Sequence, residues 1–238
     1  MASLIDRVRV APGKAAGLAK RDPHDDLGLA KGDSEQQVAD AIAKLAPLQN
    51  RFWAESTRAV LVVLQGMDAA GKDGTIRRIF TGLNPQGCRV ASFKAPTATE
   101  LDHDYLWRVH AVCPERGEIG IFNRSHYEDV AVVRVHELVP EKVWRRRFHH
   151  IREFERTLAE EGTAIVKVFL HISEDEQRER LQARLDDPEK RWKFRLGDLD
   201  DRKRWDDFQR AYEDAITETS TEWAPWHVVP ADRKWVRD

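Results

Sequence analysis

The segment from Leu61 to Thr75 carries the residues whose spacing most directly indicates chemistry. An apolar run leads into the sequence Gly-Met-Asp-Ala-Ala-Gly-Lys, and a helical pattern follows it. A strand, a glycine loop and a helix in this order form a phosphate-binding loop, in which backbone N–H groups and the helix N-terminus face a phosphate. The positions that we expect to contact phosphates are Gly66, Ala69, Ala70, Gly71, Lys72, Asp73 and Gly74.

Charged side chains in this loop define what it could bind. Lys72 adds a positive charge that would face a phosphate. Asp73 stands where Ser or Thr normally follows the lysine and holds magnesium, while Asp68 places a carboxylate inside the loop. A carboxylate beside phosphates is repelled unless it carries a cation or a proton, so we expect Asp68 to coordinate Mg²⁺, or Mn²⁺ in its place. The simpler alternative is a tight turn with a solvated lysine.

A second polar cluster, Asn-Arg-Ser-His-Tyr-Glu-Asp, begins at Asn123 directly after an apolar run. Arg124 has the fork geometry that suits phosphoryl oxygens. Asn123, Glu128 and Asp129 carry oxygen atoms that could hold magnesium, and we favour the first two as metal ligands. A helix cap followed by acidic residues would also explain Ser125 and the two carboxylates, but it would not explain Arg124 near a positive helix end.

A third cluster, residues 173–198, indicates a mobile lid over phosphates. Arg180 and Arg184 are four residues apart and therefore lie on one helix face. Pro188 then breaks the helix, and a second basic turn contains Lys190 and Trp192, whose ring could stack on a nucleotide base. The alternative for each arginine is a solvated, charged helix face.

Other basic residues extend a positive strip beyond these clusters. Arg77 and Arg78 follow the glycine loop, and Lys94 follows the second expected strand. A further run, residues 145–147, lies in a helix of mixed charge, and there a solvated face is the better interpretation.

The elements that must position these clusters alternate between strands and helices. The patterns predict strands at 60–64, 89–93, 118–122, 164–172 and 226–229. They predict helices at 34–56, 72–83, 99–114, 141–160, 173–185 and 202–219, with Pro47 bending or breaking the first. This order predicts an α/β fold: a parallel sheet covered by helices on both faces, with ligands at the C-terminal ends of the strands. We expect residues 1–33 to form an irregular arm and residues 34–238 to form a single domain.

Composition restricts the classes of partner. The chain has 238 residues, of which 34% are charged, and its formal net charge is only -2, so any polyanion must meet a local basic patch. This balance, without an aromatic-basic surface pattern, argues against nucleic acid. The two cysteines fit no disulfide or metal framework. No apolar run is long enough to span a bilayer and no signal-peptide core is present, so we expect a cytoplasmic protein without membrane partners.

Together these motifs resemble the polyphosphate kinase 2 family. The resemblance covers about residues 35–238 and rests on four ordered segments: residues 66–74, residues 122–129, the basic residues of 180–193, and the closing segments 212–214, 224–226 and 230–235. It implies a P-loop kinase-like, three-layer α/β/α fold with a helical lid. It also implies magnesium-dependent, reversible phosphoryl transfer between inorganic polyphosphate and a nucleotide, by an enzyme that forms dimers or tetramers.

The residue types beside Arg124 refine this resemblance. Many family members have Asp at the position of Asn123 and Trp at the position of His126. The Asn-Arg-Ser-His-Tyr-Glu form resembles the subgroup, termed class III, that phosphorylates both nucleoside mono- and diphosphates. We therefore expect AMP and ADP as acceptors, with GMP and GDP as alternatives and ATP as the final adenine product.

The motifs and the resemblance lead to one mechanism and two rivals. We expect the loop and Lys72 to hold phosphates, Arg124, Arg180 and Arg184 to stabilise the transferring group, and a polyphosphate chain to lie on the strip formed by Arg77, Arg78 and Lys94. Lys190 and Trp192 would bind the nucleotide. The rivals are an ATP-dependent kinase of a small metabolite or nucleotide, and a non-catalytic module that binds nucleotides or polyanions.

Overall fold

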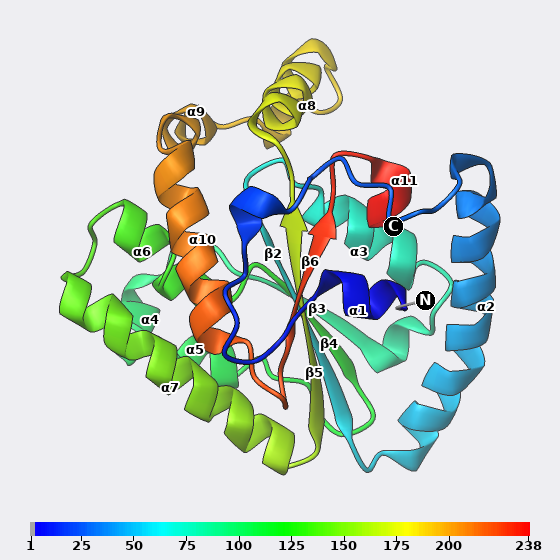
Figure 1. Ribbon diagram of the computed structural model, residues 1–238. Coiled ribbons are helices and arrows are strands. Elements are labelled where there is room, and N and C mark those ends of the chain that lie inside the picture. The colour runs from blue at the N-terminus through cyan, green and yellow to red at the C-terminus, as the bar shows by residue number, and fades with distance from the viewer. Residues whose placement is uncertain (1–2) are drawn as a thin grey trace.

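A six-stranded β-sheet forms the centre of the computed structural model, which describes residues 3–238 (Figure 1). Its strand order is β1-β6-β5-β2-β4-β3. The strands are β1 Arg9–Val10, β2 Ala59–Gly66, β3 Cys88–Ser92, β4 Ile119–Asn123, β5 Thr163–His171 and β6 Trp226–Pro230. All neighbouring strands pair in parallel except β1, which pairs antiparallel with β6. The α/β class predicted from the sequence is confirmed.

Helices cover both faces of the sheet because its central strands are apolar on both sides. α7 (Glu141–Glu160) and α10 (Trp205–Thr219) lie on one face, while α2 (Lys31–Glu55) and α3 (Lys72–Phe80) lie on the other (Figure 1). The short helices are α1 Leu4–Val8, α4 Ala98–Leu101, α5 Trp107–His110, α6 Val132–Val135 and α11 Lys234–Arg237. The 3₁₀ turns are η1 Leu18–Lys20, η2 Pro85–Gly87, η3 His126–Asp129 and η4 Arg191–Lys193.

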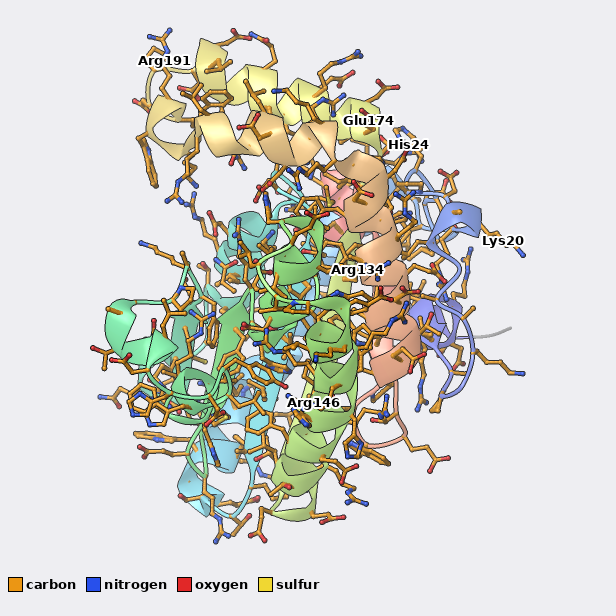
Figure 2. All side chains as sticks on the ribbon, turned by 90° about the vertical axis from the view of Figure 1, so that its left-hand side faces the viewer. Lys20, His24, Arg134, Arg146, Glu174 and Arg191 are labelled. Atoms are coloured by element: carbon orange, nitrogen blue, oxygen red, sulfur yellow. The ribbon has the colours of Figure 1, made fainter. Side chains whose placement is uncertain are left out.

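The segment predicted from the sequence to form a lid, residues 173–198, contains α8 (Glu174–Asp186), the turn η4 and the start of α9 (Leu196–Lys203), and we refer to these three elements as the lid. Figure 1 shows α8 and α9 beyond the C-terminal ends of the strands. In the side view of Figure 2, Glu174 lies at the end of the lid near the body of the protein, and Arg191 lies toward its far end. The lid therefore stands above the edge of the sheet where the polar loops meet.

Several helix boundaries differ from the sequence-based predictions. The helix expected over 99–114 is two short helices, because Thr97 caps α4 and the Asp104 carboxylate accepts a hydrogen bond from the Leu106 N–H, which forms a turn between them. The helix expected over 202–219 is divided at Arg204 into α9 and α10. α2 continues through Pro47 and does not break there.

The N-terminal segment contains ordered elements where an irregular arm was expected. β1 extends the sheet, and Val10 and Leu18 are buried in the main core. The Glu213 carboxylate on α10 accepts hydrogen bonds from the backbone N–H groups of Gly17 (2.8 Å) and Leu18 (2.7 Å). This segment is therefore packed against the same core as the rest of the chain.

Within residues 3–238, no helix combines the length and the apolar character that crossing a membrane requires.

The packing of Leu18 predicts a measurable contribution to stability. Its side chain is 3% exposed, so Leu18→Ala should lower the free energy of unfolding by about 2–5 kcal/mol. Urea denaturation followed by circular dichroism measures this change. Leu4→Ala, at an exposed position of α1, is the control and should change stability by less than about 0.5 kcal/mol. Equal stabilities for the two variants would show that the N-terminal segment is not part of the core.

Candidate active site

The loop between β2 and α3 has the backbone geometry of a close strand-to-helix turn. Gly66 has φ of 154°, and a Cβ there would lie 2.8 Å from the Leu170 carbonyl oxygen. Gly71 has φ of 108° and precedes the first residue of α3. Because these positions exclude side chains, the loop backbone can approach a ligand closely. The strand, loop and helix predicted from the sequence are present in that order.

Lys72 folds back over this loop. Its Nζ donates hydrogen bonds to the carbonyl oxygens of Gly66 (2.7 Å) and Met67 (3.2 Å), and the residue is 9% exposed. Burial, together with the positive charge of Arg124, lowers the pKa of Lys72 to about 8. A bound phosphate would raise the pKa of Lys72 again, because an anion near an ammonium group favours its protonated form.

Arg124 lies between two carboxylates from different loops. Its Nη2 is 2.6 Å from Asp68 Oδ1, and its Nη1 is 3.5 Å from Glu128 Oε2. Arg124 also has φ of 60°, a left-handed conformation that non-glycine residues seldom adopt. Burial raises the pKa of Glu128, and the charges of Arg124 and Lys72 act against this rise. The structure thus brings Asp68, Lys72, Arg124 and Glu128 into one charged cluster.

Asp73, near the start of α3, contacts both Asn123 at the end of β4 and Lys193 in the lid. It accepts a hydrogen bond from the Asn123 side-chain amide (2.8 Å) and forms an ion pair with Lys193 Nζ at 3.4 Å. Lys193 was not among the residues predicted for the site. Its position in the second basic turn of the lid was the available signal, but the sequence did not show that it would reach Asp73.

Arg180 binds backbone atoms in this structure. Its guanidinium donates to the carbonyl oxygens of Ala69 (3.0 Å), Ala70 (2.8 Å), Ala231 (2.5 Å) and Asp232 (3.0 Å), and its Nε donates to Glu176 (2.6 Å). All of its N–H donors are therefore committed, and contact with a phosphate would require some of these bonds to be exchanged. The arginine holds α8 against the phosphate-binding loop.

The remaining predicted residues either pair with residues outside the charged cluster or are exposed. Arg184 pairs with Asp198 of α9 (3.5 Å), and Lys190 pairs with Asp187. Trp192 is 76% exposed, with Lys193 Nζ 5.2 Å from its ring centre. The residues predicted to form the polyphosphate strip, Arg77, Arg78 and Lys94, are exposed, and Arg78 faces Glu35 of α2 at 3.8 Å.

Two residues at the phosphate-binding loop, Arg237 and Gln65, were not predicted from the sequence. A Cβ on Gly71 would lie 2.2 Å from Nη1 of Arg237, whose guanidinium also approaches Gly74. The sequence carried no signal for this contact, which joins positions far apart in the chain. Gln65, the fully buried residue before Gly66, donates a hydrogen bond to Ser125 Oγ at 3.0 Å and thus connects the two loops.

The family model described as Polyphosphate kinase 2 matches residues 28–238. The chain belongs to this family. It is 59% identical to an AMP/ADP-polyphosphate phosphotransferase of Meiothermus ruber, over 98% of this chain and 88% of the relative. It is 48% identical to an ADP-polyphosphate phosphotransferase of Rhodopseudomonas palustris, over 95% of this chain and 83% of the relative. The crystal structure of polyphosphate kinase 2 from Arthrobacter aurescens TC1 matches with a TM-score of 0.95 and 45% identity, covering 99% of this chain and 85% of that chain.

The family assignment confirms the resemblance inferred from the motifs, and it makes the chain a phosphotransferase. The charged cluster has the donor chemistry that such an enzyme needs for a divalent cation. Mg²⁺ at phosphate sites is bound by oxygen atoms, commonly one or two carboxylates completed by substrate phosphates and water. Asp68 and Glu128 supply two such carboxylates, and both are paired with the guanidinium of Arg124. Among residues 3–238, no group of three or more His, Cys, Asp or Glu side chains is arranged around a metal position, so substrate oxygens would have to complete the coordination.

The depressed pKa of Lys72 predicts a pH-dependent stability of the enzyme without substrate. An unfolded lysine titrates near 10.4, whereas folded Lys72 titrates at about 8. Between these values the unfolded state binds more protons, so the contribution of Lys72 to stability should increase as the pH rises, by up to about 1.4 kcal/mol per pH unit. Urea unfolding of wild type and Lys72→Met from pH 7 to pH 10 should show this increase in the difference between the two proteins. A difference that stays constant with pH would mean that Lys72 titrates as an ordinary lysine.

Proposed function

We propose that this enzyme transfers phosphoryl groups reversibly between inorganic polyphosphate and adenine nucleotides, converting AMP to ADP and ADP to ATP. The observation that carries the proposal is the cluster in which Arg124 lies between Asp68 and Glu128, beside the buried Lys72. Phosphoryl transfer depends mainly on positioning and on neutralising the charge of the phosphates. A glycine loop, a lysine, an arginine and two carboxylates supply both.

Each group in the cluster has a role in this proposal. The N–H groups of residues 66–74 and Lys72 bind phosphates, and Arg124 contacts oxygens of the transferring group. Asp68 and Glu128 would hold Mg²⁺ or Mn²⁺, assisted by Asn123, and the cation would neutralise charge on the phosphates. The terminal oxygens of AMP and ADP are already anionic, so the acceptor needs no strong general base.

The lid and the basic strip complete the proposed substrate sites. Arg180 and Arg184 stabilise charge at the transferring group once the lid rearranges, and Lys190 and Trp192 bind the nucleotide. The polyphosphate chain lies along Arg77, Arg78 and Lys94, whose side chains are exposed. We also propose that the enzyme is cytoplasmic and forms a homodimer or homotetramer, and that neither nucleic acid nor membrane is a partner.

Use of both AMP and ADP is the finer part of the proposal. It is supported by the sequence from Asn123 to Glu128 and by the likeness to the M. ruber relative, whose name includes both acceptors. The R. palustris relative, which is less similar, is named for ADP alone. GMP and GDP are alternative acceptors to be compared in the same assay.

Product formation from polyphosphate tests both parts of the proposal. Long-chain polyphosphate and Mg²⁺ are supplied with AMP or, separately, with ADP, in the absence of ATP. We expect ATP from ADP, and ADP followed by ATP from AMP, measured by chromatography of the nucleotides. ATP from ADP alone would remove AMP from the acceptors. If polyphosphate gives no product and a separate assay with ATP as the donor does, an ATP-dependent kinase is favoured. Binding of nucleotide or polyphosphate without product in either assay would favour a non-catalytic module.

Substitutions in the phosphate-binding loop test the roles of its charged residues. Lys72→Ala and Asp68→Ala should each lower kcat/KM by about 10²–10⁴-fold, because Lys72 neutralises negative charge in the transition state and Asp68 would hold the cation that does the same. Arg145→Ala is the matched control, since Arg145 is an exposed residue of α7 that pairs with Glu141 and lies over the Trp144 ring. Activities near wild type in a folded loop variant would exclude that residue from the mechanism.

A further inference from the structure

A buried ion pair lies beneath η3 and takes no part in the mechanism above. Lys167 on β5 and Glu155 on α7 are both 0% exposed, and Lys167 Nζ is 2.6 Å from Glu155 Oε2. The ammonium group also donates to the Tyr127 hydroxyl and to the Thr219 carbonyl oxygen, each at 2.8 Å. Burying two charges costs desolvation free energy that their attraction seldom exceeds, so such a pair is weak evidence for a role in stability.

The pair is connected directly to the turn that carries the active-site residues. Glu155 Oε1 accepts a hydrogen bond from the Tyr127 hydroxyl (2.8 Å) and lies 3.2 Å from His126 Nε2. The other end of the turn is also held, because Arg147 donates to the Asp129 carbonyl oxygen at 2.9 Å. Arg147 therefore binds inside the protein, whereas a solvated face had been predicted for it.

In the loop after β4, residues 124–129, these anchors separate side chains that are bonded within the protein interior from side chains that face the charged cluster. His126, Tyr127 and Asp129 are held by the protein interior, while Arg124 and Glu128 extend to the charged cluster. Arg124 has a left-handed φ of 60°, and a non-glycine residue keeps such a conformation only when its surroundings enforce it. The anchored turn begins only two residues after Arg124, so its position limits the backbone freedom of that residue.

We infer that Lys167 and Glu155 are positioning residues for phosphoryl transfer. Through Tyr127 and His126 they hold η3 in place, and η3 in turn keeps Arg124 and Glu128 where both can reach the phosphates. The inference rests on the proposed role of the charged cluster. It assigns to the buried pair an effect on the rate of transfer that is separate from any effect on folding.

Two double variants separate positioning from stability. Glu155→Leu with Lys167→Met removes both charges, so no unpaired charge remains buried and the protein should fold. It also removes Glu155 as the partner of Tyr127 and His126 and leaves the Tyr127 hydroxyl with Thr219 Oγ1 at 3.0 Å. We therefore expect kcat to fall by about tenfold or more while KM for the nucleotide changes little. Glu155→Gln with Lys167→Met keeps an amide that can bond the Tyr127 hydroxyl, and it should restore kcat to within about threefold of wild type.

Tyr127→Phe is a milder test that keeps the ion pair. It removes only the hydroxyl that joins the pair to η3, and it should lower kcat in the same direction as the Leu/Met variant. Gln49→Leu is the matched control, because Gln49 is buried and bonds the backbone of Asn84 far from η3. It should lower thermal stability and leave kcat unchanged.

The comparison uses kcat in whichever reaction the wild-type enzyme catalyses, so a different phosphoryl donor would overturn the proposed function but not this test. Loss of kcat in the Leu/Met variant, recovery in the Gln/Met variant and a lower kcat in Tyr127→Phe support the inference. A folded Leu/Met variant with wild-type kcat overturns it. So does a loss of kcat that follows melting temperature equally in all variants, including Gln49→Leu.

Discussion

The ion pair between Arg124 and Asp68 is the contact on which the active site depends. It joins the loop after β2 to the loop after β4, residues that are 56 positions apart in the chain. Because β2 and β4 are parallel neighbours, their C-terminal ends lie at the same edge of the sheet. The guanidinium attracts both Asp68 and Glu128 and offsets part of the repulsion between these two carboxylates.

The surroundings of Arg124 maintain this contact against unfavourable local geometry. The left-handed backbone at Arg124 is unfavourable by itself, and the buried residues of η3 are bonded on the inner side by Glu155 and Lys167. Gln65 bonds Ser125 and so holds the same loop from β2. Arg124 and Glu128 of this loop are thereby left to face the charged cluster. Polar groups of the interior thus define a conformation that an apolar core alone would not specify.

The lid is connected to the phosphate-binding loop after β2 by contacts of different strength. Arg180 bonds the carbonyl oxygens of the phosphate-binding loop within the first half of α8, which fixes that part of the helix to the body. Beyond it, the contact between lid and loop is the ion pair of Lys193 with Asp73, in which Asp73 is 60% exposed at its side chain. An exposed ion pair is weak, so an incoming polyanion can compete with Asp73 for Lys193. The base of the lid and its tip are therefore held with different strengths.

Features that depend on residues close together in the chain could be predicted from the sequence. The run from Leu61 to Thr75 specified a strand, a glycine loop and a helix, and the alternation of apolar and amphipathic segments specified an α/β fold. The order of the motifs identified the family, because their spacing is a property of the chain. Helix ends were less predictable: Asp104 and Arg204 interrupt patterns that periodicity would continue, and Pro47 lies within a helix that other contacts maintain.

Which charged residues meet depends on how distant segments pack together. The packing turns Arg180 toward backbone carbonyls, brings Arg237 from the end of the chain to Gly71, and places Lys193 beside Asp73. It also buries Lys167 in a strand whose sequence gave no sign of an ionic partner on α7. These contacts depend on strand order and on the orientation of each helix over the sheet. Local spacing does not encode these relations, because they arise from the packing of segments that are distant in the chain.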